Sequence, residues 1–191
     1  MNQTQATLPV EGLALPEPGD WKLDAVHTSV TFTARQLMVS KVRGKFTEVS
    51  GAIHISRDPA HSWVEVKIDP ATVETGNEKR DAHLRSPDFF GVQRYPEITF
   101  RSTQIEGSSR ARFLVHGDLT VHGVTRPVML DVAYPGPATD PPGGRWAVFS
   151  ATTVVDRRDF GVTWNAALEG GGLVVGRKIR LELEVEALKQ F

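Results

Sequence analysis

The chain has 191 residues, the length of one domain, and its hydrophobic content of 40% and charged content of 24% are ordinary for a globular protein. A formal net charge of −1 provides no general attraction for nucleic acid, so we expect no nucleic-acid partner. The sequence contains no cysteine, which excludes disulfides, zinc–thiolate sites and a cysteine nucleophile. No apolar run approaches the roughly 18 residues of a membrane-spanning helix, and we expect no stable membrane insertion.

The first 19 residues differ in character from the rest of the chain. They contain three prolines and no regular hydrophobic period, which predicts a flexible N-terminal arm at 1–19 in front of a single domain at 20–191. The arm also lacks the basic start and the apolar core of a signal peptide. We therefore expect a cytoplasmic protein.

From Trp21 onward the hydrophobic period is two, as in half-buried strands. Val30, Phe32 and Ala34 share one face of the first such run, and the runs at 63–68 and 179–185 alternate in the same way. The whole chain contains about eight strands at spacings typical of a β-sandwich or a β-barrel. The pattern predicts an all-β fold and leaves these two architectures open.

Residues 74–100 interrupt the strands with the clearest helical segment of the chain. Asn77 can cap a helix over 78–85, and Ser86 followed by Pro87 predicts a second helix start. Two adjacent phenylalanines follow, so we interpret the segment as a lid over a hollow interior. The lid hypothesis predicts that Leu84, Phe89 and Phe90 face the interior and that Lys79, Arg80 and Arg85 face solvent.

Signals of catalysis are weak. The six histidines form no chelating pair, and no GxSxG motif is present, so we expect no metal site, no cofactor and no enzyme. Glycines 170–172 precede a strand and not a helix, which predicts a turn and not a phosphate loop. Asp156 and Asp159 flank Arg157 and Arg158, a pattern typical of a salt-bridged strand end.

The aromatic and aliphatic residues of the strands and the insertion can line an apolar cavity or simply fill a packed core. Under the cavity interpretation, the candidate lining residues are Val30, Phe32, Phe46, Ile53, Leu84, Phe89, Phe90, Phe100, Val115, Phe149 and Trp164. The candidates for binding a polar head group are His27, Arg35, His83 and Arg157.

Four stretches carry a resemblance to a known family: WKLDAVHTSVTFTARQLMVSKVRGKFTEVSGAI, DAHLRSPDFFGVQRYPEITFRST, GDLTVHGVTRPVMLDV and DRRDFGVTWN. In this order they resemble the YceI-like, polyisoprenoid-binding family from Trp21 to the C-terminus. The resemblance implies an extended eight-stranded antiparallel, lipocalin-like β-barrel with a short helical insertion, often dimeric. Two features differ from the family pattern: many members carry a secretion signal where we expect a proline-containing arm, and Gly176, Arg177 and Lys178 stand where an acidic residue is frequent.

Together, the pattern and the resemblance predict non-enzymatic binding, storage or transport of a long-chain polyisoprenoid (polyprenyl or quinone-type) or a similar amphiphilic lipid by a homodimer. Two alternatives stay open. One is an enzyme acting on an isoprenoid or quinone lipid, with His27 or His83 beside a carboxylate such as Asp81. The other is a haem-binding barrel that uses a histidine ligand.

Overall fold

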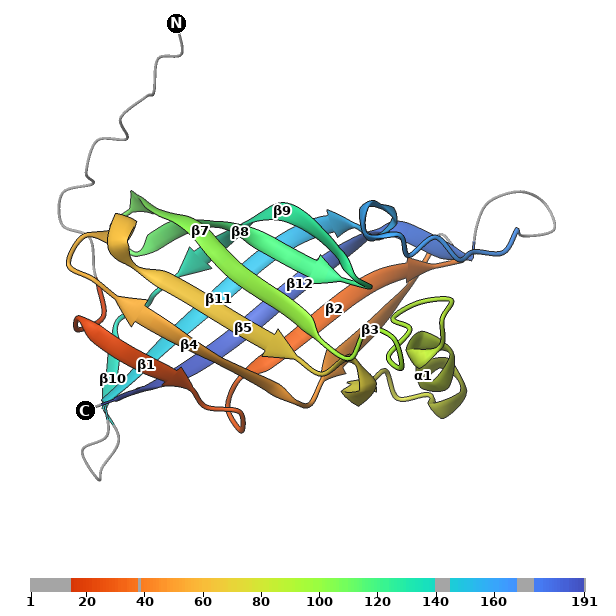
Figure 1. The fold of residues 1–191 in the computed structure, drawn as a ribbon, viewed down its shortest axis with the longest axis horizontal. Coiled ribbons are helices and arrows are strands. Elements are labelled where there is room, and N and C mark those ends of the chain that lie inside the picture. The colour runs from red at the N-terminus through yellow and green to blue at the C-terminus, as the bar shows by residue number, and fades with distance from the viewer. Residues whose placement is uncertain (1–14, 38, 140–144, 168–173, 191) are drawn as a thin grey trace, which may run out of the picture.

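The computed structural model describes residues 15–37, 39–139, 145–167 and 174–190, and these residues form twelve strands, one α-helix and three short 3-10 helices (Figure 1). The elements are β1 Gly19–Leu23, β2 Ser29–Gln36, β3 Ser40–Phe46, β4 Val49–Ile55, η1 Pro59–His61, β5 Trp63–Ile68, η2 Pro70–Thr72, β6 Val73–Glu74, α1 Glu78–Arg85, β7 Ile98–Ser109, β8 Arg112–Val121, β9 Val124–Ala133, β10 Pro137–Thr139, β11 Arg145–Asp156, η3 Arg157–Phe160 and β12 Val175–Lys189.

Three positions in the sheet are each occupied by two short strands: β1 with β2, β4 with β3, and β5 with β6. β1 and β2 follow one another along the same edge of β12, and they pair on their other side with β4 and β3 respectively. In the same way, β5 pairs with β4 and β6 with β3. With β7, β8, β9, β11 and β12, the described strands therefore occupy eight positions in one antiparallel sheet.

The sheet closes on itself. β11 pairs with β12 over eleven residue pairs, from Trp146 opposite Leu188 to Asp156 opposite Lys178, and its other edge pairs with β9. Closure pairs the outermost strands with each other and so removes exposed edges, which a sandwich retains. The eight-stranded antiparallel barrel with a short helical insertion is confirmed, and the sandwich alternative is wrong.

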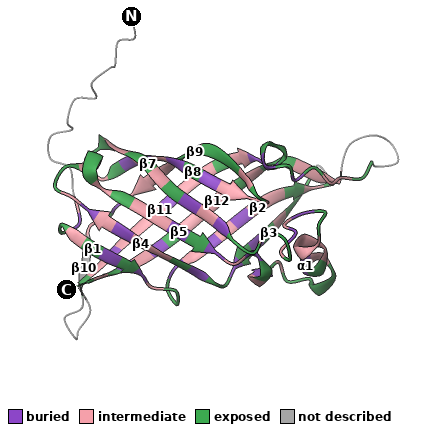
Figure 2. Ribbon diagram, in the orientation of Figure 1, coloured by how far each residue is buried: buried purple, intermediate pink, exposed green. Residues whose placement is uncertain are grey.

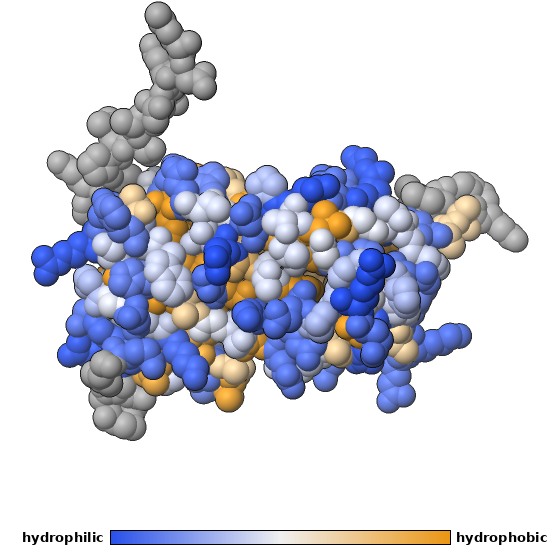
Figure 3. All heavy atoms as spheres, in the orientation of Figure 1, coloured by the Kyte–Doolittle hydropathy of each residue, from blue (hydrophilic) through white to orange (hydrophobic). Residues whose placement is uncertain are grey.

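The side chains alternate as the period-two pattern predicts. Along β8, Phe113, Val115, Gly117 and Leu119 are buried, and half-buried or exposed residues alternate with them (Figure 2). On the face shown in Figure 3 hydrophilic residues predominate, with hydrophobic ones visible between them. Gly117 belongs to the inward set because a Cβ there would lie 2.4 Å from the Phe100 ring. A glycine at this position lets the end of the Phe100 ring approach the β8 backbone closely.

Pro127 lies inside β9, opposite Asp118 on β8. β9 pairs with β11 only from Asp131 onward. Near Pro127, β9 is therefore paired with β8 along one edge and is not paired with β11 along the other. A proline is tolerated where one edge of a strand is unpaired, because no second ladder needs its missing N–H.

The helix begins as predicted. The Asn77 side chain accepts a hydrogen bond of 2.9 Å from the backbone N–H of Arg80, which caps α1. The second helix start at Ser86 is wrong. Ser86 instead ends α1, and the backbone N–H groups of Phe89 and Phe90 reach back to the carbonyls of Ser86 and Leu84. Because these bonds fold the chain back onto the end of α1, the residues after Ser86 form turns.

The predicted inward face of the insertion is confirmed: Phe89 is buried, and the half-buried Leu84 and Phe90 pack against the core. Lys79 is exposed as expected.

The expectation that Arg80 and Arg85 face solvent is wrong. Both are half-buried, and their guanidinium groups donate to backbone carbonyls: Arg80 to Thr75 at 2.9 Å, and Arg85 to Ala71 and Val73 at 2.7 and 2.9 Å. Carbonyls at the ends of short elements lack partners, and the forked donors of arginine satisfy them.

Asp156 ends β11 in a cluster of cations, as the sequence predicted. Arg158 donates to its carboxylate at 3.0 and 3.1 Å, and Arg177 and Lys178 lie 3.7 and 4.0 Å away. The hydrogen bonds from Arg158 lower the pKa of Asp156 to about 2. The turn predicted at 170–172 lies outside the described residues.

This cluster predicts a loss of stability in acid. Because folding lowers the pKa of Asp156 from 3.8 to about 2, its contribution is complete above pH 4 and is lost as the pH falls through 2. Between about pH 5 and pH 2, the free energy of unfolding should fall by about 1 to 2 kcal/mol more in the unchanged protein than in Asp156→Asn. Urea titrations across this range measure the difference, and parallel pH profiles for the two proteins would contradict it.

Candidate functional site

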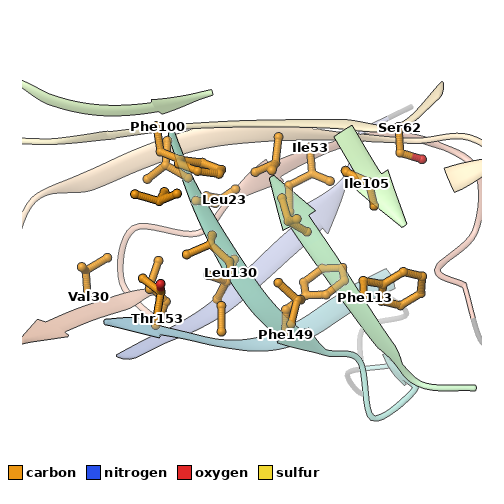
Figure 4. Close-up of a pocket in the computed structure, with 18 of the residues that line it drawn as sticks. Leu23, Val30, Ile53, Ser62, Phe100, Ile105, Phe113, Leu130, Phe149 and Thr153 are labelled. Atoms are coloured by element: carbon orange, nitrogen blue, oxygen red, sulfur yellow. The ribbon is translucent and has the colours of Figure 1, made fainter. Parts of the chain in front are cut away.

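The interior of the barrel contains an apolar cavity of about 140 Å³ (Figure 4). Its lining side chains come from strands all around the barrel, and the polar ones among them are Ser62 and Thr153. The structure places five of the candidate lining residues around it: Val30, Ile53, Phe100, Val115 and Phe149. The strand pattern missed others of the same type, such as Leu130 on β9, although their alternation carries the same signal.

One end of this cavity is closed by residues from outside the strands. Leu15 and Pro16, which precede β1, line it together with Pro59 and Ser62 of the β4–β5 connection. In Figure 4, Ser62 lies with Phe113 at one end of the cavity. We expected residues 15–18 to belong to a flexible arm, but Pro16 is buried and Leu15 packs against the core. Composition alone did not indicate this contact.

A second cavity, of about 460 Å³, lies between α1 and strands β2 and β3. We call it the α1 cavity. Phe32, Leu84, Phe89 and Trp164, all predicted lining residues, line it on its apolar side. Its polar lining residues are Arg35, Gln36, Asn77, Lys79, Arg80 and His83. Among the described residues that line it, cations are present and carboxylates are absent.

An aromatic cluster lies where the two cavities approach each other. Val30 and Phe32 are two residues apart on the inner face of β2, about 7 Å along the strand, and line different cavities. The Phe32 ring lies 5.6 Å from Phe46, which lies 5.6 Å from Phe90. Phe46 therefore packs between Phe32 and Phe90. Neither Phe46 nor Phe90 is among the residues that line the barrel cavity or the α1 cavity.

Gly44 accommodates this cluster. A Cβ at Gly44 would lie 2.3 Å from the tip of the Phe32 ring. The ring of Phe32 therefore lies over the backbone of its pairing partner on β3.

His83 is held in a fixed orientation at the α1 cavity. Its Nε2 lies 2.8 Å from the carboxylate of Asp88, and its ring contacts Phe89 and Trp164 with centroid separations of 5.0 and 4.6 Å. The carboxylate proposed as its partner, Asp81, is buried and accepts hydrogen bonds from the N–H and hydroxyl of Thr75. The predicted pairing of His83 with Asp81 is therefore wrong.

His27 lies elsewhere in the barrel. Its Nδ1 is 2.8 Å from Asp24, whose hydrogen bond raises the pKa of the imidazole, and its ring contacts Trp146 at the start of β11. The side chain is 57% exposed, and it is not among the described residues that line either cavity. His27 and His83 therefore do not share a site.

The two arginine candidates differ in placement. Arg35 is exposed and lines the α1 cavity. Arg157 is buried, and its guanidinium donates to four backbone carbonyls at 2.8–3.2 Å. These bonds use its donors on the protein itself, so Arg157 has a structural position, while Arg35 is available to a ligand.

Within the residues that the structure describes, no three or more His, Asp or Glu side chains gather as a metal site. No helix in the same part of the chain has the length and apolar character needed to cross a membrane.

Comparison with known proteins agrees with this architecture. The model of the YceI-like domain matches residues 21–187. A UPF0312 protein of Staphylococcus aureus is 33% identical over 169 residues, which cover 87% of this chain and 96% of the relative.

Two solved structures share the fold. The Campylobacter jejuni YCEI protein superposes with a TM-score of 0.69 at 30% identity, over 82% of this chain and 90% of the other. A polyisoprenoid binding domain from Saccharophagus degradans superposes with a TM-score of 0.67 at 15% identity, over 91% and 100%. The closed barrel, its helical insertion and these matches together show that the chain belongs to the YceI-like family.

Proposed function

We propose that the protein binds a long-chain polyisoprenoid, of the polyprenyl or quinone type, or a similar amphiphilic lipid, and stores or carries it without chemical change. The observation that carries this proposal is an apolar cavity inside a closed barrel, beside a second cavity with cationic lining residues. The relation to a polyisoprenoid binding domain of the same fold supports the choice of lipid class.

The barrel cavity suits a hydrocarbon tail. Each buried CH₂ group contributes about 0.8 kcal/mol, part of which is offset by the loss of chain flexibility on binding. A sugar or peptide there would lose its hydrogen bonds to water, since among the described lining residues only Ser62 and Thr153 offer side-chain partners, through their hydroxyls. A tail without polar groups incurs no such penalty.

The α1 cavity suits the polar head group. Arg35 and Lys79 are exposed, and Arg80 and His83 complete a lining that favours electron-rich oxygens such as those of a phosphate or a quinone. In this arrangement the tail passes the Phe32 ring to reach the barrel cavity. The apolar position of Phe32 makes it a contact for the first carbons of the tail.

The enzyme alternative rests on His83, which lines the α1 cavity with its Nε2 bonded to Asp88. Recovery of an unchanged quinone or prenyl lipid after incubation with the protein would exclude it. A haem inside the barrel needs an axial ligand, and the described residues that line the barrel cavity include no histidine.

Homodimer formation and a cytoplasmic location are part of our proposal. Sedimentation of the purified protein tests the first, and cell fractionation tests the second.

Mass spectrometry of organic extracts from the purified protein tests the function. We expect an isoprenoid lipid in the extract, and binding of both a polyprenol and its phosphate when they are added. Replacing Arg35 and Lys79 together by glutamine should weaken the phosphate about tenfold and the alcohol little, because charge-assisted hydrogen bonds contribute about 1.5 kcal/mol or more. A protein that is empty and ignores both lipids would contradict the proposal.

A further inference from the structure

The segment before β1 closes the barrel cavity at the end opposite α1. Leu15 and Pro16 line the cavity there, while Val30 lines it on the side of β2, the strand that continues into the α1 cavity. The first residue of β1, Gly19, pairs with Ile55 at the end of β4, which leads into the η1 connection. The closing segment and η1 therefore lie at the same end of the barrel (Figure 1).

Charged and polar contacts hold this segment in place. Glu17 forms ion pairs with Arg145 of β11 and, at 2.8 Å, with Lys189 of β12. Lys189 also donates to the carbonyl of Pro18 at 2.8 Å. The indole N–H of Trp21 donates to the carbonyl of Glu17 at 3.1 Å. The closing segment is thus tied to three neighbouring strands of the barrel, β11, β12 and β1.

These contacts limit the space for a tail. The cavity lining runs from Leu119 to Phe113 along β8, about 20 Å of strand, or about 15 Å along the axis when strands tilt by about 40°. A chain that enters from the α1 cavity meets Leu15 and Pro16 at the far end. Carbons beyond that point have no room without displacing a segment that is anchored by Glu17.

We propose that Leu15 and Pro16 form the floor of the barrel and set the length of the lipid tail that the protein accepts. This inference rests on the proposed function and deepens it, because it assigns chain-length selectivity to named residues. Affinity should rise with the number of isoprene units until the tail reaches Leu15, and should rise no further for longer chains. We call the chain length at which affinity stops rising the preferred length.

The test uses a series of prenyl alcohols from geraniol through farnesol and geranylgeraniol to longer polyprenols, measured by displacement of a fluorescent lipid from the full-length protein. Leu15→Trp fills the floor and should shift the preferred length to shorter chains. For the longest chain that the unchanged protein binds well, the affinity should fall about 15-fold. Expelling one CH₂ group from the cavity lowers the affinity about fourfold, and we expect the new ring to expel two. Leu15→Ala should shift the preference to longer chains.

Val26→Trp is the matched control, because Val26 lies in the β1–β2 loop with 83% of its surface exposed. It should leave the length preference unchanged. If chains bind but the preferred length is the same in all variants, the floor is elsewhere and this inference fails alone. If the unchanged protein binds none of the chains, the proposed function fails with it.

Discussion

Replacing Ala151 by phenylalanine is expected to weaken the binding of a polyprenyl chain by about 50-fold. Ala151 is buried on β11 and lines the barrel cavity between Phe149 and Thr153, so the added ring would occupy space that we assign to the tail. If the ring displaces three CH₂ groups at about 0.8 kcal/mol each, the loss is about 2.4 kcal/mol, which corresponds to this factor. Titration with a labelled polyprenol measures the change.

Val154→Phe provides the matched control for this variant. Val154 lies on the same strand, with 53% of its surface exposed. The control should bind the chain as the unchanged protein does. The two variants should also unfold at similar urea concentrations, because the ring at 151 enters an existing cavity. Equal binding by both variants would show that the tail does not occupy this part of the barrel.

The second large effect concerns the buried Arg157. Its Nε and Nη2 donate to the carbonyls of Gly176 and Val175 at 3.0 and 3.2 Å, and its Nη1 donates to those of Val162 and Trp164 at 2.8 and 2.9 Å. Arg157→Met should lower the free energy of unfolding by about 3 to 5 kcal/mol. Each buried carbonyl left without a partner costs about 1 to 3 kcal/mol, and such costs are not fully additive.

Arg158→Met is the comparison for this prediction. Arg158 is the next residue, half exposed, and it bonds to Asp156 at the surface of the same turn. A partly exposed ion pair contributes about 1 kcal/mol or less, so this variant should remain close to the unchanged protein. Urea unfolding of both variants separates the two roles. A loss of similar size in both would mean that the four carbonyl contacts of Arg157 add little stability.

Arg157 also illustrates where prediction from sequence is limited. Residues 156–159 place two arginines between two aspartates, and the sequence correctly predicted an ion-pair cluster at Asp156, because its main partner is two residues away. Arg157 was also a candidate for binding a polar head group, because a guanidinium can donate charge-assisted hydrogen bonds. Its side chain instead reaches carbonyls on the segment after η3 and on β12, and no local pattern encodes those distant acceptors.

The segment at 74–100 shows the same difference between contacts that a local pattern predicts and contacts that depend on the folded chain. Asn77 was identified as the cap of α1 because capping depends on residues within one turn. The inward position of Phe89 followed from its apolar character. The burial of Arg80 and Arg85 could not be predicted, since it depends on carbonyls of β6, η2 and the following turn that only the folded chain places beside α1.

The sequence by itself determined the strands, their inward faces, the helix cap and the apolar character of the interior. These follow from period-two alternation and from contacts between residues close in the chain. The tertiary structure alone decided that β11 pairs with β12 to close a barrel, that Phe32, Phe46 and Phe90 cluster between the two cavities, and that Leu15 closes one end. These contacts join residues distant in sequence, and their formation depends on the packing of the whole barrel.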